Sequence, residues 1–488
     1  GIFVKGLDGE LEIDSQEAVL MVDSRDVTAK AGDLLRWPIE MSSISGKVEL
    51  KLEEEGLEIR TPALHVKNEH VETVTRAIVE VSSDKKVFLD LHSNIANGIG
   101  KHAYRYIPTA IISEGLVEWL DAAFIEGFVP AGSFIFHGMA NDYPFVENQG
   151  VMQVQFDVKD GRLHFLDGWP DVENSSASVR FHNASLIVEN ARSTNKSGAT
   201  ALINASIPDL KDAMLFVNGT VKADADELQQ YIWNSGLDPV LGRAVEQFQA
   251  AGQAEIDIDI QVPLGKKRKE VDQLQASGEI AFLDNELFFP VSDYLLTDLN
   301  GQLSFTTTSI KGEDIRGNFY GQPVNIDVYT FEDIANPETQ FHVSGNWAVA
   351  SLLKKFDWDF PSILDGSSQW DVVMHVPHKT VDYNVMFDAF SNLEGVRIGL
   401  SEIISKPAGQ SVPITVNLKI LGDARQLKVA SENTLDLNAT FDDDNNWLFD
   451  VASPVMTGKG KLNANFDINT TGEFDLDHLN LSAFMSGD

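Results

Sequence analysis

The chain has 488 residues, a formal net charge of −37 from 74 acidic and 37 basic residues, and no cysteine. The negative charge argues against nucleic acid as a partner, because phosphates attract basic proteins, and the lack of cysteine excludes thiolate metal sites, redox pairs and cysteine nucleophiles. Hydrophobic residues make up 43% of the chain, which is enough for a packed structure, and no run of about 18 apolar residues spans a bilayer.

Alternation of apolar and polar residues, the pattern of strands with one apolar face, recurs along the chain. It is seen in GELEID (9–14), GKVELKL (46–52), VMQVQFDV (151–158), SLIVENA (185–191), AEIDIDIQVPL (254–264), GQLSFTT (301–307), VNIDVYTF (324–331), QWDVVMHV (369–376), ITVNLKIL (414–421), TLDLNATF (434–441) and KLNANFDI (461–468). Clusters of Asp, Asn and Gly are typical of hairpin turns. We expect such turns at KDGR (159–162), LDNE (283–286), DDDNN (442–446) and NTTGE (469–473).

Helix signals are few, and they predict helical insertions near residues 109–126, 224–252 and 348–356. In the first insertion Ser113 is a candidate N-cap, and one helix face carries Leu116, Val117, Leu120 and Phe124. This helix either closes or gates one rim of the sheet, or it packs on the sheet and covers an edge.

The repeated strands predict an elongated array in which each unit contacts its neighbours. Roughly 25 strands spaced about 4.8 Å apart would extend on the order of 100 Å, and sheets of this size curl or split. The predicted fold is mainly β: a long, curled, twisted antiparallel sheet that forms an open groove, with a few short helical insertions. Residues 1–488 are expected to be one continuous segment of this groove.

One block carries a resemblance to a known family. The segment YRYIPTAIISEGLVEWLDAAFIEGFVPAGSFIFHGMANDYPF (104–145) resembles the YhdP family, a branch of the AsmA-like bacterial envelope proteins. The matching pieces are YIPTAIISEGLVEWLDAA (106–123), FIFHG (134–138) and DYPF (142–145). Residues 150–191 and 299–328 also fit this family, so the resemblance covers most of the chain.

The resemblance implies a parent protein anchored in the inner membrane of a Gram-negative bacterium, with a long periplasmic β-groove that carries phospholipids towards the outer membrane. The chain begins with GIFVKGLDGELEID and ends with LNLSAFMSGD, both next to strand patterns. We therefore expect a monomeric periplasmic fragment without the N-terminal anchor and the C-terminal part. It would reach both membranes through parts outside this chain.

The apolar side chains of the alternating strands are the candidate lining of a lipid groove. The residues alone favour a core between packed sheets over a groove, and the resemblance reverses this preference. A single bulge reverses the alternation, so the direction of each side chain stays open. The candidate residues are Ile256, Ile258, Ile260, Val262, Phe282, Leu303, Phe305, Ile326, Val328, Val372, Met374, Val376, Val416, Leu418, Ile420, Leu435, Leu437 and Phe441.

Other patterns indicate little chemistry. The basic run GKKRKE (265–270) suits a solvated hairpin tip, with a phosphate or partner contact as the alternative. His375 and His378 have no further metal ligand nearby in the sequence. Asp257 and Asp259 lie about 7 Å apart on one strand face and suit a solubilising outer surface. We predict no catalytic residue, no metal and no cofactor.

The predicted function is non-enzymatic transport of phospholipids between inner and outer membranes, with acyl chains sliding along the apolar groove. A structural envelope scaffold with a self-packed apolar face is the alternative. A carbohydrate-active enzyme is a third reading, but it requires two carboxylates in a cleft, and the sequence nominates no pair.

Overall fold

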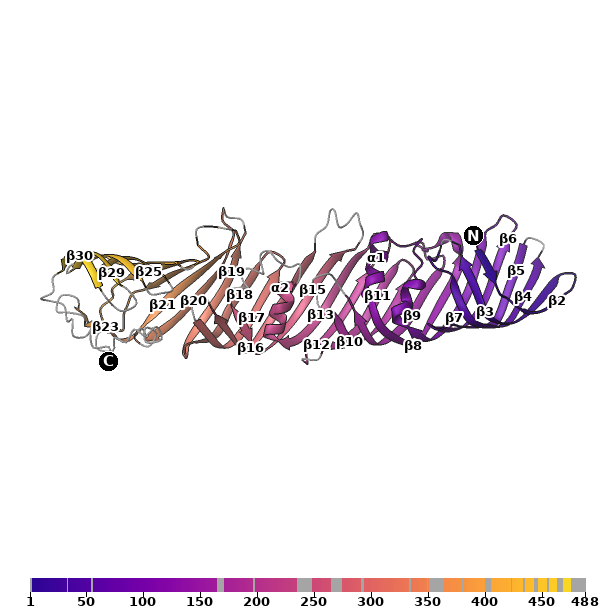
Figure 1. Cartoon of the computed structure of the whole chain (residues 1–488), viewed down its shortest axis with the longest axis horizontal. Coiled ribbons are helices and arrows are strands. Elements are labelled where there is room, and N and C mark those ends of the chain that lie inside the picture. Colours follow the sequence, from indigo (N-terminus) through magenta and orange to yellow (C-terminus); the bar gives the residue numbers. More distant parts are fainter. Residues whose placement is uncertain are drawn as a thin grey trace. The chain divides into compact units, whose positions relative to one another are not determined.

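The computed structural model describes residues 2–32, 34–53, 56–164, 171–195, 198–234, 248–264, 274–290, 294–332, 335–348, 350, 364–379, 381, 383–399, 405–422, 424–432, 435–442, 446–453, 456–462 and 468–474. The chain divides into two compact units, and Figure 1 labels their helices and strands. The first comprises Gly1–Ala223, Asn234–Gly236 and Ile256–Ser277, and the second comprises Asp224–Trp233, Leu237–Glu255 and Gly278–Asp488.

The first unit is an antiparallel sheet in which β1 and β2 both pair with β3. From β3 to β13 each strand pairs with the next one in the chain, and β15 pairs with β13. The strands are β1 Ile2–Lys5, β2 Gly9–Ile13, β3 Glu17–Ala31, β4 Ile39–Glu53, β5 Gly56–Lys67, β6 Glu72–Ser82, β7 Val87–Ile99, β8 Phe124–Met139, β9 Val151–Leu163, β10 Val172–His182, β11 Ser185–Thr194, β12 Thr200–Ile207, β13 Met214–Asp224 and β15 Gln253–Pro263.

The second unit is also an open antiparallel sheet. Neighbouring strands pair in chain order, except that β22 pairs directly with β25, while β23 and β24 extend one end of β21. The strands are β14 Gln249–Ala251, β16 Gln275–Phe289, β17 Tyr294–Thr306, β18 Ile310–Phe319, β19 Gln322–Phe331, β20 Glu338–Ala348, β21 Leu364–Pro377, β22 Val385–Ser391, β23 Val396–Gly399, β24 Ser405–Lys406, β25 Ile414–Leu421, β26 Ala424–Ser431, β27 Leu435–Asp442, β28 Trp447–Ala452, β29 Met456–Leu462 and β30 Ile468–Phe474.

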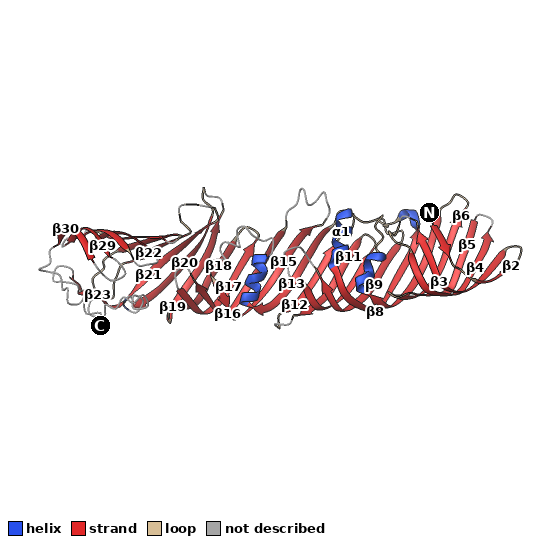
Figure 2. Ribbon diagram, in the orientation of Figure 1, coloured by secondary structure: helices blue, strands red, loops and turns tan. Residues whose placement is uncertain are grey.

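Helices are short and few in the described part of the chain (Figure 2). They are α1 Glu114–Ala123, α2 Ala225–Asn234, and the 3-10 segments η1 Gly100–Arg105 and η2 Ala140–Asp142. The predicted N-cap is confirmed, because the Ser113 hydroxyl accepts a hydrogen bond from the Leu116 amide at 3.3 Å. The predicted insertion at 348–356 lies almost wholly outside the described residues. No described helix is long and apolar enough to cross a membrane.

The predicted fold class is confirmed: the described chain is mainly β, with open antiparallel sheets and few helices. Three of the predicted hairpin turns are wrong, however. KDGR (159–162) lies within β9, LDNE (283–286) lies within β16, and NTTGE (469–473) lies within β30. The predicted turn at 442–446 does separate the paired strands β27 and β28, although residues 443–445 lie outside the described set.

The physical reason for two of these errors is a recurring β-bulge. Asp160 and Asp284 have left-handed φ angles of 52° and 53° inside continuous strands, and Asn190 and Asp314 repeat this conformation. Asp and Asn tolerate left-handed backbone in bulges as well as in turns, so composition alone does not separate the two structures. A bulge bends its strand and increases the local twist, which favours the curled sheet that the sequence predicts.

The bulge residues share a hydrogen bond to the next strand. The Asn190 amide donates to Asn204 Oδ1 at 3.1 Å, and the Asp314 amide donates to Asp327 Oδ1 at 2.8 Å. An Asp or Asn on the neighbouring strand therefore satisfies a backbone donor that the bulge removes from the sheet ladder. This pairing accounts for part of the Asn and Asp content of the strands.

Candidate functional site: an apolar face in register

The apolar residues of the second unit form continuous rows across its strands. Side chains of directly opposed residues in an antiparallel pair lie on the same face of the sheet. The first row is Ile315, Ile326, Val343, Val372, Ala389, Val416, Val429, Leu437, Val451 and Gly458. The second row is Leu303, Gly312, Val328, Phe341, Met374, Phe387, Leu418, Leu427, Ala439, Phe449 and Gly460.

The second row crosses eleven strands, from β17 to β29, so it extends about 50 Å at a strand spacing of about 4.8 Å. We call the surface formed by these two rows the apolar face of the second unit. Every member is apolar or glycine.

The exposure of this face distinguishes it from an ordinary core. Phe341, Phe387, Leu418, Leu427 and Phe449 lie in the middle of their strands, yet each is only half-buried. Residues at such positions in a sandwich would be covered by a second sheet about 10 Å away. Within the described residues, the centre of this face is therefore not fully covered by protein.

The opposite face of the same strands is mainly polar. The row between the two apolar rows, directed to the other side, is Asp327, His342, Val373, Asp388, Asn417, Lys428, Asn438, Asp450, Lys459 and Thr471. A hollow of about 410 Å³ lies against this region and is lined mostly by polar and charged side chains of β25–β29, among them Asn417, Lys428 and Asp450.

The eighteen residues predicted to line a groove are all withdrawn from solvent to some degree. Nine are buried and nine are half-buried: the buried ones are Ile256, Ile260, Val262, Phe305, Ile326, Val328, Met374, Val376 and Ile420. The register of the strands places several of these residues in the first row, namely Ile326, Val372, Val416 and Leu437. A role for them in binding lipid stays a prediction.

The sequence analysis missed the residues that complete the rows. Phe341 and Val343 of β20 and Leu427 and Val429 of β26 join the predicted residues. The signal was present, because each pair alternates with polar neighbours in the sequence.

The first unit has an apolar face of the same kind, although the sequence analysis named only Ile256, Ile258, Ile260 and Val262 of β15 as groove candidates in this unit. One of its rows is Ile44, Val66, Thr73, Ile95, Gly132, Phe156, Val179, Val188, Ala205 and Val217. On β15 of this unit Ile256, Ile260 and Val262 are buried, whereas Asp257 and Asp259 are exposed. The Thr220 hydroxyl donates to Asp257 Oδ1 at 2.5 Å, so this carboxylate takes part in an outer-face contact.

The two histidines of MHVPH do not come together as a metal site. His375 Nδ1 lies 3.0 Å from Glu338 Oε1, and its Nε2 lies 3.2 Å from Asp388 Oδ2. His378 Nε2 instead lies 2.9 Å from the Thr339 hydroxyl. No group of three potential metal ligands is found within the described ranges. The basic run at 265–270 lies outside them.

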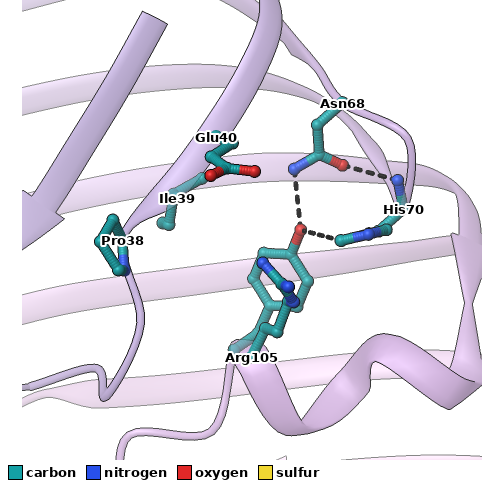
Figure 3. A pocket seen from close by; sticks show the side chains of 7 residues that line it. Pro38, Ile39, Glu40, Asn68, His70 and Arg105 are labelled. Atoms are coloured by element: carbon teal, nitrogen blue, oxygen red, sulfur yellow. Dashed lines mark hydrogen bonds between the residues drawn. The ribbon is translucent and has the colours of Figure 1, made fainter. Parts of the chain in front are cut away.

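A small cavity of about 10 Å³ lies where η1 meets the turn between β5 and β6 (Figure 3). Asn68 Nδ2 donates to the Tyr106 hydroxyl at 2.8 Å, and the imidazoles of His70 and His102 stack with ring centroids 3.9 Å apart. Burial lowers the pKa of both histidines, and neighbouring positive charge, with Arg105 the largest such contributor at His70, lowers it further. The cavity has room for about one water molecule, which is too little for a ligand. We therefore interpret the hydrogen bond and the stacked rings around it as contacts that hold η1 in place.

Comparison with known proteins identifies a family. A family model described as YhdP protein matches residues 3–485. The "Intermembrane phospholipid transporter YhdP" of Escherichia coli (strain K12) is 25% identical over 351 residues, which cover 71% of this chain and 27% of that relative. The matched part is thus about a quarter of the length of that relative. No solved structure matches this chain. On the extent of the family match, the chain belongs to the YhdP protein family.

Proposed function

We propose that this chain is a non-enzymatic segment of a conduit for phospholipids between the inner and outer membranes of a Gram-negative bacterium. Acyl chains would lie on the apolar faces of the two units and slide along their rows. The observation that carries the proposal is the row from Leu303 to Gly460, which crosses eleven strands without a polar side chain and in which Phe341, Phe387, Leu418, Leu427 and Phe449 are only half-buried. The name of the E. coli relative supports phospholipid as the cargo.

The energetics favour a surface of this kind. Exposing a CH₂ group to water costs about 0.8 kcal/mol, so one 16-carbon acyl chain in water costs on the order of 12 kcal/mol. A continuous apolar row removes most of this barrier without any chemical step. The headgroup stays in water beside the sheet, so no dedicated headgroup pocket is required.

The setting follows from the same reasoning. We place the chain in the periplasm, within a longer protein held at the inner membrane, because an intermembrane carrier has to cross the aqueous space between membranes. The described residues would then form part of one continuous groove, and contacts with both membranes would come from other parts of the parent protein. The mainly polar outer face of the described strands suits a monomer in water.

The alternative function is a structural scaffold whose apolar face is fully covered by protein. The half-buried state of Phe341, Phe387 and Leu427 disfavours it, because a scaffold would gain most stability by burying these side chains completely. An enzymatic function has no comparable support among the described residues. His375, for example, contacts the carboxylates of Glu338 and Asp388 on the outer face and away from the apolar rows.

Native mass spectrometry of the chain purified without detergent tests the proposal. We expect several phospholipids bound per chain, and extraction should identify them as diacyl species. A chain that carries no lipid and takes up no fluorescent phospholipid, while remaining folded by circular dichroism, would favour the scaffold. Uptake measured with a soluble short-chain headgroup analogue serves as the control, and it should show no binding.

A further inference from the structure

We propose that helix α1 is a gate that lies across the apolar face of the first unit and is held closed by an ion pair between Arg36 and Asp121. This inference rests on the proposed function, because a gate has meaning only if acyl chains use the face beneath it.

The two ends of α1 are attached to loops at opposite ends of the strands. At its start the Ser113 amide donates to the Leu210 carbonyl at 3.0 Å, in the loop between β12 and β13. At its end the Ala123 carbonyl accepts from the His164 amide at 2.9 Å, just after β9. These two attachment points lie at opposite ends of the strands. β9 ends where Leu163 pairs with Val172, whereas β12 terminates at the other end of the strands, where Ile207 pairs with Leu186. The helix therefore crosses the face of the sheet, as Figure 2 shows near β9 and β11.

Burial indicates which face it crosses. On α1, Leu116 and Leu120 are 0% and 5% exposed, whereas Glu118 and Asp121 are exposed. On the apolar face of β10, β11 and β12 the residues Val179, Leu186 and Ile207 are also buried, at 7%, 5% and 0%.

Two comparisons within the unit support this placement. On β7 and β8 the same apolar face is only half-buried at Leu91, Ile95 and Phe134. On the other face of β9 and β12, Gln155 and Asn204 remain exposed. The apolar stripe of α1 thus covers the apolar face over part of the sheet and leaves neighbouring strands open. An acyl chain moving along the row would meet the helix.

The ion pair connects α1 to the loop between β3 and β4. Arg36 Nη1 donates to Asp121 Oδ2 at 2.7 Å and Arg36 Nη2 donates to Asp121 Oδ1 at 2.5 Å, a two-pronged arrangement. Arg36 Nη2 also lies 3.4 Å from the Tyr104 carbonyl, at the end of η1. The hydrogen bond with Asp121 raises the pKa of Arg36. Both side chains are about one third exposed, so water reaches the pair and hydrates both charged groups when it opens.

Hydrogen exchange on the full 488-residue chain tests the gate. We expect Arg36→Asp and Asp121→Arg each to raise exchange of the α1 amides about threefold to tenfold, as loss of one partly exposed ion pair allows. The double variant Arg36→Asp with Asp121→Arg restores the pair in reverse and should return exchange close to the wild-type rate. Arg36→Gln provides a milder variant if charge reversal disturbs folding. Arg60→Asp, which breaks a pair with Glu58 on the same unit, is the matched control and should leave α1 unchanged.

A phosphatidylethanolamine carrying a diazirine on one acyl chain provides the second readout. In the single variants, labelling of peptides containing Leu186 and Ile207 should rise severalfold over wild type, with labelling near Leu418 of the second unit unchanged. Unchanged α1 exchange in the single variants, or equal labelling beneath α1, would overturn the gate. Absence of label near Leu418 in the wild-type chain would instead count against the proposed function, while the exchange data would still decide whether the ion pair holds α1.

Discussion

Leu418 lies directly opposite Phe387 on neighbouring strands, and both side chains are half-buried in the middle of the apolar face. The adjacent residue Asn417 faces the other side and donates to Asp388 at 2.7 Å. Neighbouring residues of β25 thus lie on the apolar and the polar side of the sheet. The same substitution can therefore be compared on the two sides.

Leu418→Asp should lower the number of phospholipids bound per chain, because a carboxylate in the row interrupts the apolar surface. The cost in the free energy of unfolding should stay below about 2 kcal/mol, since a half-buried site rehydrates more easily than a core. Native mass spectrometry and urea unfolding measure the two effects. Thr415→Asp, at an exposed position on the same side of β25 as Asn417, is the control and should leave lipid binding unchanged; a loss of several kcal/mol in Leu418→Asp would indicate a packed core.

The carboxylates beside the apolar residues of β15 should not matter for transport. Asp257→Asn and Asp259→Asn should bind lipid like the wild-type chain, because both residues are exposed on the outer face. Ile258→Asp, between them in sequence but on the apolar side, should reduce lipid uptake. If either Asn variant abolishes function while the chain stays folded, an active site at these carboxylates has to be reconsidered.

The bulge at Asn190 should tolerate glycine and resist β-branched residues. With φ at 53°, Asn190→Val should destabilise the chain by about 1–2 kcal/mol, because left-handed backbone strains a β-branched residue. Asn190→Gly should remain within about 0.5 kcal/mol of wild type. Equal urea midpoints for the Val and Gly variants would show that the strand does not depend on this conformation.

The stacked histidines His70 and His102 predict a pH response at η1. Their pKa values are lowered from 6.5, so the unfolded chain binds more protons than the folded chain as pH falls through about 6.5. Their neutral forms therefore suit the folded state above that pH, and stability should decrease below it. Hydrogen exchange of η1, corrected for intrinsic rates, should rise between pH 7.5 and pH 5.5. The double variant His70→Asn with His102→Asn should lose this dependence; an unchanged response would assign it to other groups.

Sequence patterns were sufficient for the class of fold and for the N-cap at Ser113, because period-2 alternation and capping are local properties. They failed at Asp160 and Asp284, where the residue types that make turns also make bulges. On β16 the bulge at Asp284 reverses which positions are buried. Before it the even-numbered Ala276 is buried, and after it the odd-numbered Asn285 and Phe289 are buried. Rows such as Ile326–Val343–Val372 depend on the register between distant segments, which no single strand pattern contains.

The central claim is that acyl chains occupy the apolar face of the second unit. Its most direct test is a photoreactive benzoylphenylalanine at Leu427, compared with the same group at Gln426, which faces the other side. After irradiation of the chain with phospholipid vesicles, the account predicts a lipid adduct at position 427 and little at 426. Equal adducts at both positions, or none at 427 in a folded chain, would contradict it.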